Sequence, residues 1–347
     1  MRLGYSLSYW GSAGLSPAEH LTLVREAERL GYHSVWAAET YGTDPASLMA
    51  WLAGQTTRIR LGTAILQMPA RRPVAAAMTA ATIDQISGGR FRLGLGFSGP
   101  QLVEGWHGLR FERPLAQARD YVAVVRMALA RQPVRYQGAT LTVPLPDSEG
   151  KEMALAVEPI QQPLPIYLAT LGPQAVRLTG EIADGWLPLN FPPEHVAACR
   201  ALLEEGAARA GRTLDGFDVA PMVMVLVEED LELAFDMVRP MLALYLGGMG
   251  SRRHNFHNQL ASRLGFADEA ERMQQAFLAG RQGEAMAAMS DELVDAMTVC
   301  GPPSRIRERF AAYREAGVTT LIVGVVPPTL PLRMEQLRMI AEIAGSL

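Results

Sequence analysis

The chain has 347 residues, of which 49% are hydrophobic and 20% are charged, and its formal net charge is −4. This balance is ordinary for a globular protein with a sizeable core, and it excludes the basic footprint of a protein that binds nucleic acid or an anionic membrane surface. No run approaches about 20 apolar residues, and Met1 leads straight into an apolar strand, so we expect neither a membrane span nor a signal peptide. The two cysteines, Cys199 and Cys300, stand far apart, which favours reduced thiols in a cytoplasmic protein.

One pattern recurs along the chain, in which an amphipathic helix leads through a Gly or Asp turn into a short apolar strand. Gly31 and Gly317 stand at two of these turns, where glycine suits the left-handed end of a helix. The strands lack strict alternation, as do parallel strands that are buried on both faces. Eight such units favour a closed (β/α)8 TIM barrel over an open, doubly wound sheet. The predicted strands are Leu3–Ser8, Ser34–Ala37, Ile59–Ile65, Phe91–Gly96, Pro165–Ala169, Gly185–Leu189, Phe217–Val227 and Thr320–Val325.

Two intervals are too long for simple connections between a strand and a helix. Residues 132–164 follow the fourth unit and predict a β-hairpin, because Gln137-Gly138 separates two β-rich runs. Residues 231–297 lie between strands seven and eight and are rich in Met, Ala and Leu at helical spacing. Neither interval has the composition of a linker, so residues 1–347 are predicted to form one domain. The helical insertion forms either a movable cover over the substrate or a packed core or dimer face.

Lys151 is the only lysine in the chain. A Walker A phosphate loop needs a lysine, and the chain has none available for one, so this motif is excluded. The shortage of lysine also argues against Schiff-base chemistry, which needs a buried lysine, because Lys151 follows the polar turn 147–150.

The residues just past each strand converge on the active site of such a barrel. Here they are aromatic, aliphatic and amide side chains with one acid, Glu39, which suits a flat conjugated cofactor better than a metal. No histidine lies at a strand end, and His254 and His257 have near-ligand spacing but no acidic neighbours, so no metal site is predicted. The segment Thr170–Pro173 places Gly-Pro at a helix start, where free backbone N–H groups suit a phosphate; a purely structural turn is the alternative.

With these features, the chain resembles the luciferase-like class of flavin and deazaflavin oxidoreductases, and more narrowly the members that use the 8-hydroxy-5-deazaflavin coenzyme F420. The resemblance runs in order along nearly the whole chain. The segments that carry it are Leu30–Trp36, Leu61–Gln67, Ile86–Phe91, Gly94–Gln101, Glu104–Gly108, Leu168–Pro173, Gly180–Trp186 and Gly301–Pro303.

The resemblance implies a set of cofactor contacts. Strand three of the class often carries a non-prolyl cis peptide in a bulge beneath the ring, which here would be Ala64–Ile65. The implied ring-binding residues are Glu39, Thr40, Ala64, Ile65, Gln67, Ser98, Gly99 and Gln101. The implied contacts to the side chain and phosphate are Thr170, Leu171, Gly172, Gln174 and Ala175. A homodimer is also implied.

The chain departs from the deazaflavin sugar-phosphate dehydrogenases of this class. Those enzymes place an Asp-His pair after strand two, where this chain has Glu39-Thr40, and a Glu after strand four, where it has Gly99 or Pro100. Sugar-phosphate oxidation is therefore not expected. We predict hydride transfer between the deazaflavin and a small organic substrate, with reduction of an electron-poor substrate favoured.

Glu39 and His107 are the candidate catalytic residues. Glu39 could polarise the ring or relay a proton, or it could be a structural carboxylate. His107 is the best available proton donor, or it could simply pack its loop. Trp10, Phe97 and Trp106 are the candidate walls of the substrate pocket.

Two other functions fit the same fold. An FMN-dependent monooxygenase would use O2 and a separate flavin reductase, and it would have to exclude water from its site. A non-catalytic barrel that only binds flavin or a partner is less consistent with the sequence, because none of the strand-end loops is truncated.

Overall fold

The computed structural model describes residues 1–7, 15–252 and 254–347, and it shows a closed parallel barrel. Strand β1 pairs with β2 on one side and with β13 on the other, and the ring closes where Asp218 and Val219 pair with Gly185 and Trp186. The predicted TIM barrel is therefore confirmed. The barrel strands are β1 (Arg2–Ser6), β2 (Ser34–Ala37), β3 (Arg60–Thr63) with β4 (Leu66–Gln67), β5 (Phe91–Gly96), β8 (Ile166–Ala169), β9 (Gly185–Trp186), β10 (Asp218–Val219) with β11 (Met222–Val227), and β13 (Thr320–Val325).

The third barrel strand contains the predicted bulge. Gly62 pairs with Arg92, and Leu66 pairs with Leu95, so residues 63–65 lie opposite residues 93–94. An extra residue on one strand is the definition of a β-bulge. The Ala64–Ile65 peptide within it is cis, as the resemblance implied.

Two strand predictions need correction. The predicted strand 217–227 is divided into β10 and β11 at Ala220-Pro221, because proline has no N–H to donate to the ladder. A further parallel strand, β12 (Thr298–Gly301), pairs with the second half of β11 and was not predicted. It follows helix α12 without an intervening turn residue, so nothing in the sequence separates the two elements.

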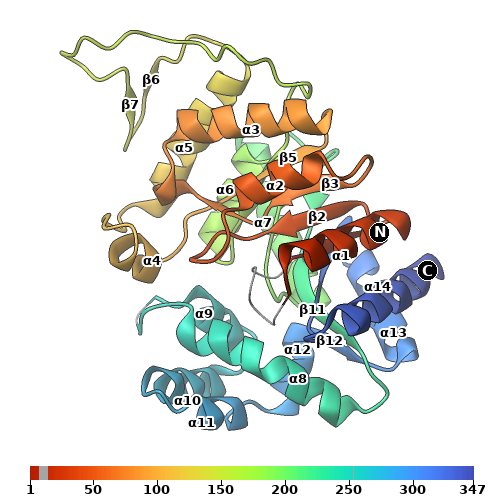
Figure 1. Cartoon of the computed structure of the whole chain (residues 1–347). Coiled ribbons are helices and arrows are strands. Elements are labelled where there is room, and N and C mark those ends of the chain that lie inside the picture. The colour runs from red at the N-terminus through yellow and green to blue at the C-terminus, as the bar shows by residue number, and fades with distance from the viewer. Residues whose placement is uncertain (8–14, 253) are drawn as a thin grey trace.

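The helices surround the barrel, as Figure 1 shows. Among the described residues, seven of the eight main helices around the barrel begin at a proline, a residue that is favoured in the first turn because its missing N–H would have no partner there. They are α1 (Pro17–Arg29), α2 (Pro45–Ala53), α3 (Pro73–Ser87), α5 (Pro114–Leu129), α6 (Pro173–Ile182), α7 (Pro193–Arg209), α13 (Pro303–Glu315) and α14 (Leu330–Gly345); two short helices, η2 (Met68–Ala70) and α4 (Pro100–Gly105), follow strands three and four.

Two hydrophobic clusters hold this arrangement together. The larger cluster fills the space between the strands and the helices. The smaller one occupies the barrel interior and contains Trp36, Tyr167, Leu187, Ala220 and Ile322. Both cysteines are buried free thiols, as predicted, and no helix in the described ranges is long and apolar enough to cross a membrane.

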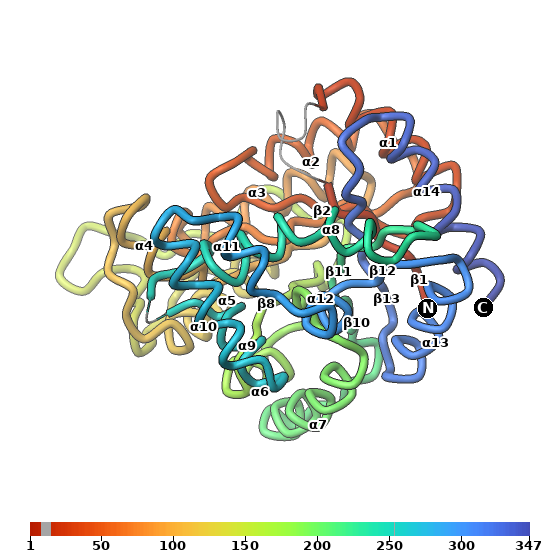
Figure 2. The backbone as a smooth tube through the Cα atoms, turned by 90° about the horizontal axis from the view of Figure 1, so that it is seen from below, coloured from red at the N-terminus to blue at the C-terminus, as the bar shows by residue number. Residues whose placement is uncertain are grey.

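Both predicted insertions are present. The β-hairpin of β6 (Tyr136–Gln137) and β7 (Thr142–Val143) is antiparallel and stands away from the barrel in Figure 1. The helical insertion forms a separate layer across one end of the barrel, and Figure 2 looks directly onto it. It consists of α8 (Leu231–Ala243), the π-helical segment η3 (Leu244–Gly248), α9 (Phe256–Arg263), α10 (Ala267–Leu278), α11 (Gln282–Ala287) and α12 (Asp291–Met297).

Candidate active site

An apolar floor lies in the barrel interior. Four partly buried residues, Ala64, Ile65, Ala169 and Met222, pack on the interior cluster. Ile65 needs the glycine at position 96, since a Cβ there would lie 2.9 Å from the Ile65 Cδ1 atom. The bulge in strand three thus places an aliphatic side chain where the resemblance puts the ring of the cofactor.

Glu39 joins the loops after strands two and three. One carboxylate oxygen accepts a hydrogen bond from the Gln67 backbone N–H at 2.6 Å, and the other forms an ion pair with Arg71. Arg71 also pairs with Asp44 at 2.5 Å. The Glu39 side chain is only 14% exposed. Since both of its oxygens have protein partners, the geometry favours a structural role for Glu39 over a proton relay.

Only one of the two polar atoms of the Gln67 side-chain amide has a hydrogen-bond partner. Its nitrogen donates to the Thr40 carbonyl at 2.6 Å, while its Oε1 atom is buried without a hydrogen-bond partner. The residue is 2% exposed. A buried acceptor without a partner costs about 1–3 kcal/mol. A ligand N–H or O–H group would remove that cost.

The loop after strand four holds the next predicted residues. Phe97, Ser98 and Gly99 are partly buried, and Gly99 caps the short helix α4. Gln101 is exposed and borders a cavity of about 620 Å³ between α4 and the helical insertion. The lining consists of Pro100, Gln101, Glu104, Gly105, Phe111, Ser251, Arg252 and His254.

The residues predicted to contact the side chain and phosphate of the cofactor differ in whether protein groups already bond them. Thr170 is buried and engaged, because its hydroxyl bonds Thr179 at 2.8 Å and its carbonyl accepts from the Trp186 indole at 2.9 Å. Gly172 caps helix α6 without a side-chain hydrogen bond. The N–H groups of Gln174 and Ala175 in the first turn therefore have no side-chain cap and can face an anion.

Asn190, which follows strand six, was not among the predicted site residues. It is 1% exposed, and both atoms of its side-chain amide lack a partner. Its φ is 55°, and Thr40 and Ser98 also have positive φ, at 41° and 61°. Non-glycine residues in this region are uncommon and gather at functional sites. The asparagine itself was the available signal, since Asn tolerates this conformation better than most residues.

The remaining predicted residues are His107, Trp106 and Trp10. His107 is partly buried, and its Nε2 atom has no partner. Trp106 is 67% exposed, so within this chain it does not wall an enclosed pocket. Trp10 falls outside the described residues. The described residues contain no group of three or more His, Cys, Asp or Glu side chains that could hold a metal ion.

The helical insertion contacts loops from three different strand ends. The Tyr41 hydroxyl reaches the Met249 sulfur at 3.9 Å, and Arg263 donates to the Leu171 carbonyl at 3.3 Å. Phe256 lies beside Gly99, because a Cβ at Gly99 would be 3.8 Å from its ring. Helix α9 therefore spans from the loop after strand four to the loop after strand five, and the insertion covers the carboxyl end of the barrel.

Comparisons with known proteins agree with this fold. A family model described as luciferase-like monooxygenase matches residues 1–320. A Mycobacterium tuberculosis protein named "Putative coenzyme F420-dependent oxidoreductase Rv3520c" is 41% identical over 330 residues, which are 93% of this chain and 94% of that protein. The chain therefore belongs to the luciferase-like monooxygenase family, and it is an oxidoreductase of that type.

Solved structures show the same fold with two different cofactors. The coenzyme F420-dependent tetrahydromethanopterin reductase of Methanopyrus kandleri has a TM-score of 0.83 at 25% identity, covering 98% of this chain and 97% of its own. The FMN complex of the oxygenating constituent of 3,6-diketocamphane monooxygenase from Pseudomonas putida has a TM-score of 0.71 at 20% identity, covering 100% of this chain and 99% of its own. The second likeness concerns the fold alone.

Proposed function

We propose that this enzyme transfers a hydride between coenzyme F420 and a small organic substrate. The observation that carries the proposal is the 41% identity, over 93% of the chain, to a relative whose name assigns it this coenzyme. Reduction of an electron-poor substrate is favoured over sugar-phosphate oxidation, because Thr40 stands where the dehydrogenases of that kind have a histidine.

The residues at the barrel mouth fit a flat ring system that ends in a phosphate. Ile65 and Ala169 give the ring an apolar surface. The unpartnered Oε1 atom of Gln67 would accept a hydrogen bond from its polar edge. The N–H groups of Gln174 and Ala175 would hold the phosphate at the start of α6.

A bound deazaflavin supplies a ring carbon that gives or accepts a hydride. The protein then has to position the substrate, exclude water and move a proton. Glu39, held by Arg71 and by the Gln67 backbone, fixes the loop that carries Gln67. The buried amide of Asn190 can hold a substrate oxygen, and His107, with a free Nε2 atom, is the proposed proton donor. The insertion, through contacts such as Arg263 with Leu171, shields the mouth from water.

The test is a pair of fluorescence titrations of purified apo-protein, one with F420 and one with FMN. Tight binding of F420 with weak binding of FMN is the expected result, followed by transfer of deuterium from labelled reduced cofactor to an electron-poor alkene, imine or ketone. Tight binding of FMN with weak binding of F420, together with oxygen uptake in the presence of a flavin reductase, would overturn the proposal in favour of a flavin monooxygenase.

We also infer that two copies of the chain associate. Several large apolar side chains are exposed on α3 and on the segment between α5 and β8, and Gln85 of α3 donates to the Glu158 carbonyl of that segment. They are Met78, Ile86, Leu145, Met153, Val157 and Ile160. Patches of this kind on soluble proteins mark interaction sites. Sedimentation equilibrium should give a dimer that Ile86→Glu weakens; a monomeric wild type would contradict this inference.

A further inference from the structure

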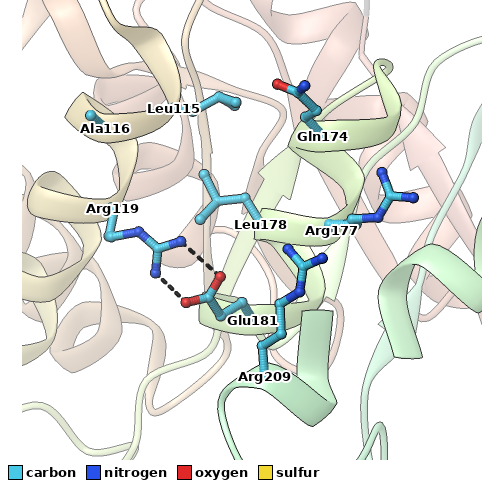
Figure 3. Close-up of a pocket in the computed structure, with 8 residues that line it drawn as sticks. All are labelled: Leu115, Ala116, Arg119, Gln174, Arg177, Leu178, Glu181 and Arg209. Carbon is cyan, nitrogen blue, oxygen red and sulfur yellow. Dashed lines mark hydrogen bonds and ion pairs between the residues drawn. The ribbon is translucent and has the colours of Figure 1, made fainter. Parts of the chain in front are cut away.

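A groove of about 520 Å³ runs along the outside of the barrel between α5 and α6. In Figure 3, Gln174 lies at one end of it, in the first turn of α6, and Arg209 lies at the other. From Gln174 to Glu181 the helix rises about 10 Å. The groove therefore starts where the phosphate of the cofactor is expected and leads away from the barrel mouth. Its lining consists of Leu115, Ala116, Arg119, Gln174, Arg177, Leu178, Glu181 and Arg209.

The groove carries an excess of positive charge. Arg119 is paired with Glu181, and Arg177 is paired with Glu205 at 2.5 Å. Arg209, at the end of α7, has no ion pair among the described residues. The pKa values of Glu181 and Glu205 are lowered mainly by Arg119 and Arg177 respectively, and Arg209 is close enough to lower both further. Three guanidinium groups thus face two carboxylates.

The partners of these arginines leave room for an incoming anion. The Glu205 side chain is 49% exposed and can turn into solvent, whereas Glu181 is only 20% exposed and is held by Arg119 on both oxygens. A guanidinium has five N–H donors, and the ion pair of Arg177 uses only part of them. Arg177 and Arg209 are therefore the two groups that are free to bind a further carboxylate.

The geometry points to this groove as the binding site for the carboxylate tail of the deazaflavin cofactor. The inference rests on the proposed function. FMN ends at its phosphate, whereas F420 continues from its phosphate into a chain of glutamate residues. A chain that leaves a phosphate at the start of α6 meets Gln174 first and then reaches Arg209, with Leu115 and Leu178 beneath its methylene groups, while Arg177 lies at the rim with its side chain directed away from α5. The groove thus favours F420 over FMN.

The expected gain in affinity is modest. Exposed ion pairs contribute little individually, and salt screens them. We expect a long-tailed form of F420 to bind about three- to tenfold more tightly than a form trimmed to a single glutamate at low ionic strength, with the difference shrinking as salt rises.

The experiment measures dissociation constants by ring fluorescence for three probes: the deazaflavin without phosphate or tail, F420 trimmed to one glutamate, and long-tailed F420. The test variant is R177Q/R209Q, which leaves the Arg119–Glu181 pair intact. The matched control is Arg200→Gln, which removes an arginine from α7 that is paired with Glu204 and is not part of the groove lining. Thermal unfolding confirms that each variant is folded.

The inference predicts that wild type and Arg200→Gln prefer the long tail, that R177Q/R209Q loses this preference, and that all three bind the tail-free ring equally. It is overturned if wild type binds long and short tails equally, or if R177Q/R209Q keeps the preference; in both cases the proposed function stands. If no deazaflavin form binds, the proposed function fails, and the inference fails with it.

Discussion

A buried carboxylate at the amino end of the barrel is fully hydrogen-bonded, whereas two buried amides at the carboxyl end have polar atoms without a hydrogen-bond partner. At the amino end, the Asp218 carboxylate accepts hydrogen bonds from the Tyr167 hydroxyl at 2.9 Å, from Thr320 at 3.2 Å and from Arg2 at 2.9 Å, and Thr319 donates as well. At the carboxyl end, the Gln67 Oε1 atom and the whole amide of Asn190 have no partner.

This difference separates stability from function along one barrel. A fully bonded buried network stabilises the fold, whereas an unpartnered buried amide costs free energy until a ligand binds it. We therefore expect the stability of the fold to depend on the Asp218 end, and binding to depend on the Gln67 and Asn190 end. This is the division of labour expected of the two faces of such barrels.

Removing the carboxylate at the amino end should have the largest effect on stability. Asp218→Ala leaves the buried Tyr167 hydroxyl and the Thr320 hydroxyl without their acceptor, so the free energy of unfolding should fall by about 3 kcal/mol. Urea denaturation measures this loss. The affinity of the folded variant for F420 should stay within about twofold of wild type. A variant that keeps its stability but loses the cofactor would reverse the assignment of the two ends.

The same substitution at two buried asparagines should give opposite results. Asn255 is bonded through both amide atoms, to the Leu246 carbonyl at 2.8 Å and to the N–H groups of His257 and Asn258. Asn255→Leu should therefore cost about 2 kcal/mol of unfolding free energy. In Asn190→Leu, the removal of two unpartnered buried amide atoms offsets the cost of about 1–2 kcal/mol for leucine at a positive φ. Its stability should therefore change little, yet KM should rise about tenfold, which corresponds to one lost hydrogen bond. Equal destabilisation by both variants would contradict the comparison.

Glu39→Gln tests whether the acid at the mouth moves a proton. The glutamine keeps an acceptor for the Gln67 N–H but loses the charge that pairs with Arg71. We expect kcat to fall less than about tenfold, with both KM and cofactor affinity changing alongside it, because the residue positions a loop. A general acid or base contributes about 10²- to 10⁴-fold. A loss of that size at constant KM would make Glu39 catalytic.

The smallest expected effect is a loss of stability of the helical insertion as the pH falls. The ring of His257 lies 5.0 Å from that of Tyr245, and burial lowers its pKa from 6.5 to about 4. Between these pH values the unfolded segment binds more protons than the folded one, so stability falls as pH falls from 6.5 towards 4. The hydrogen-exchange protection factors of residues 256–263, which are corrected for the intrinsic pH dependence of exchange, should fall over this range, and His257→Phe should flatten the dependence. An unchanged pH dependence in that variant would exclude His257 as its source.

The fold could be predicted from the sequence because its signals are local. Short apolar strands, prolines at helix starts and glycines at helix ends repeat along the chain. Each of these signals depends only on residues that are close in sequence. Strand β12 was missed because Thr298 follows Met297 without a turn residue. The bulge and the Ala64–Ile65 cis peptide came from the resemblance, since no local pattern indicates them.

The site could be predicted only in part, because its chemistry depends on pairs that are distant in sequence. The ion pair between Glu39 and Arg71 spans two loops, and of the two roles considered for Glu39 it favours the structural carboxylate over the proton relay. The Asn190 amide has no hydrogen-bond partner because no other polar group of the described residues lies within reach of it in the folded chain, and no sequence pattern indicates this. The placement of the insertion over the mouth rests on contacts such as Tyr41 with Met249.

The most direct test of the account is the unfolding free energy of Gln67→Leu with and without saturating F420. Without cofactor, the variant should be about as stable as wild type, because removing an unpartnered buried acceptor offsets the loss of the hydrogen bond from Gln67 Nε2 to the Thr40 carbonyl. With cofactor, wild type should gain more stability than the variant does. A variant that is destabilised without cofactor, and that gains as much from F420 as wild type does, would contradict the claim that the barrel mouth is completed by the cofactor.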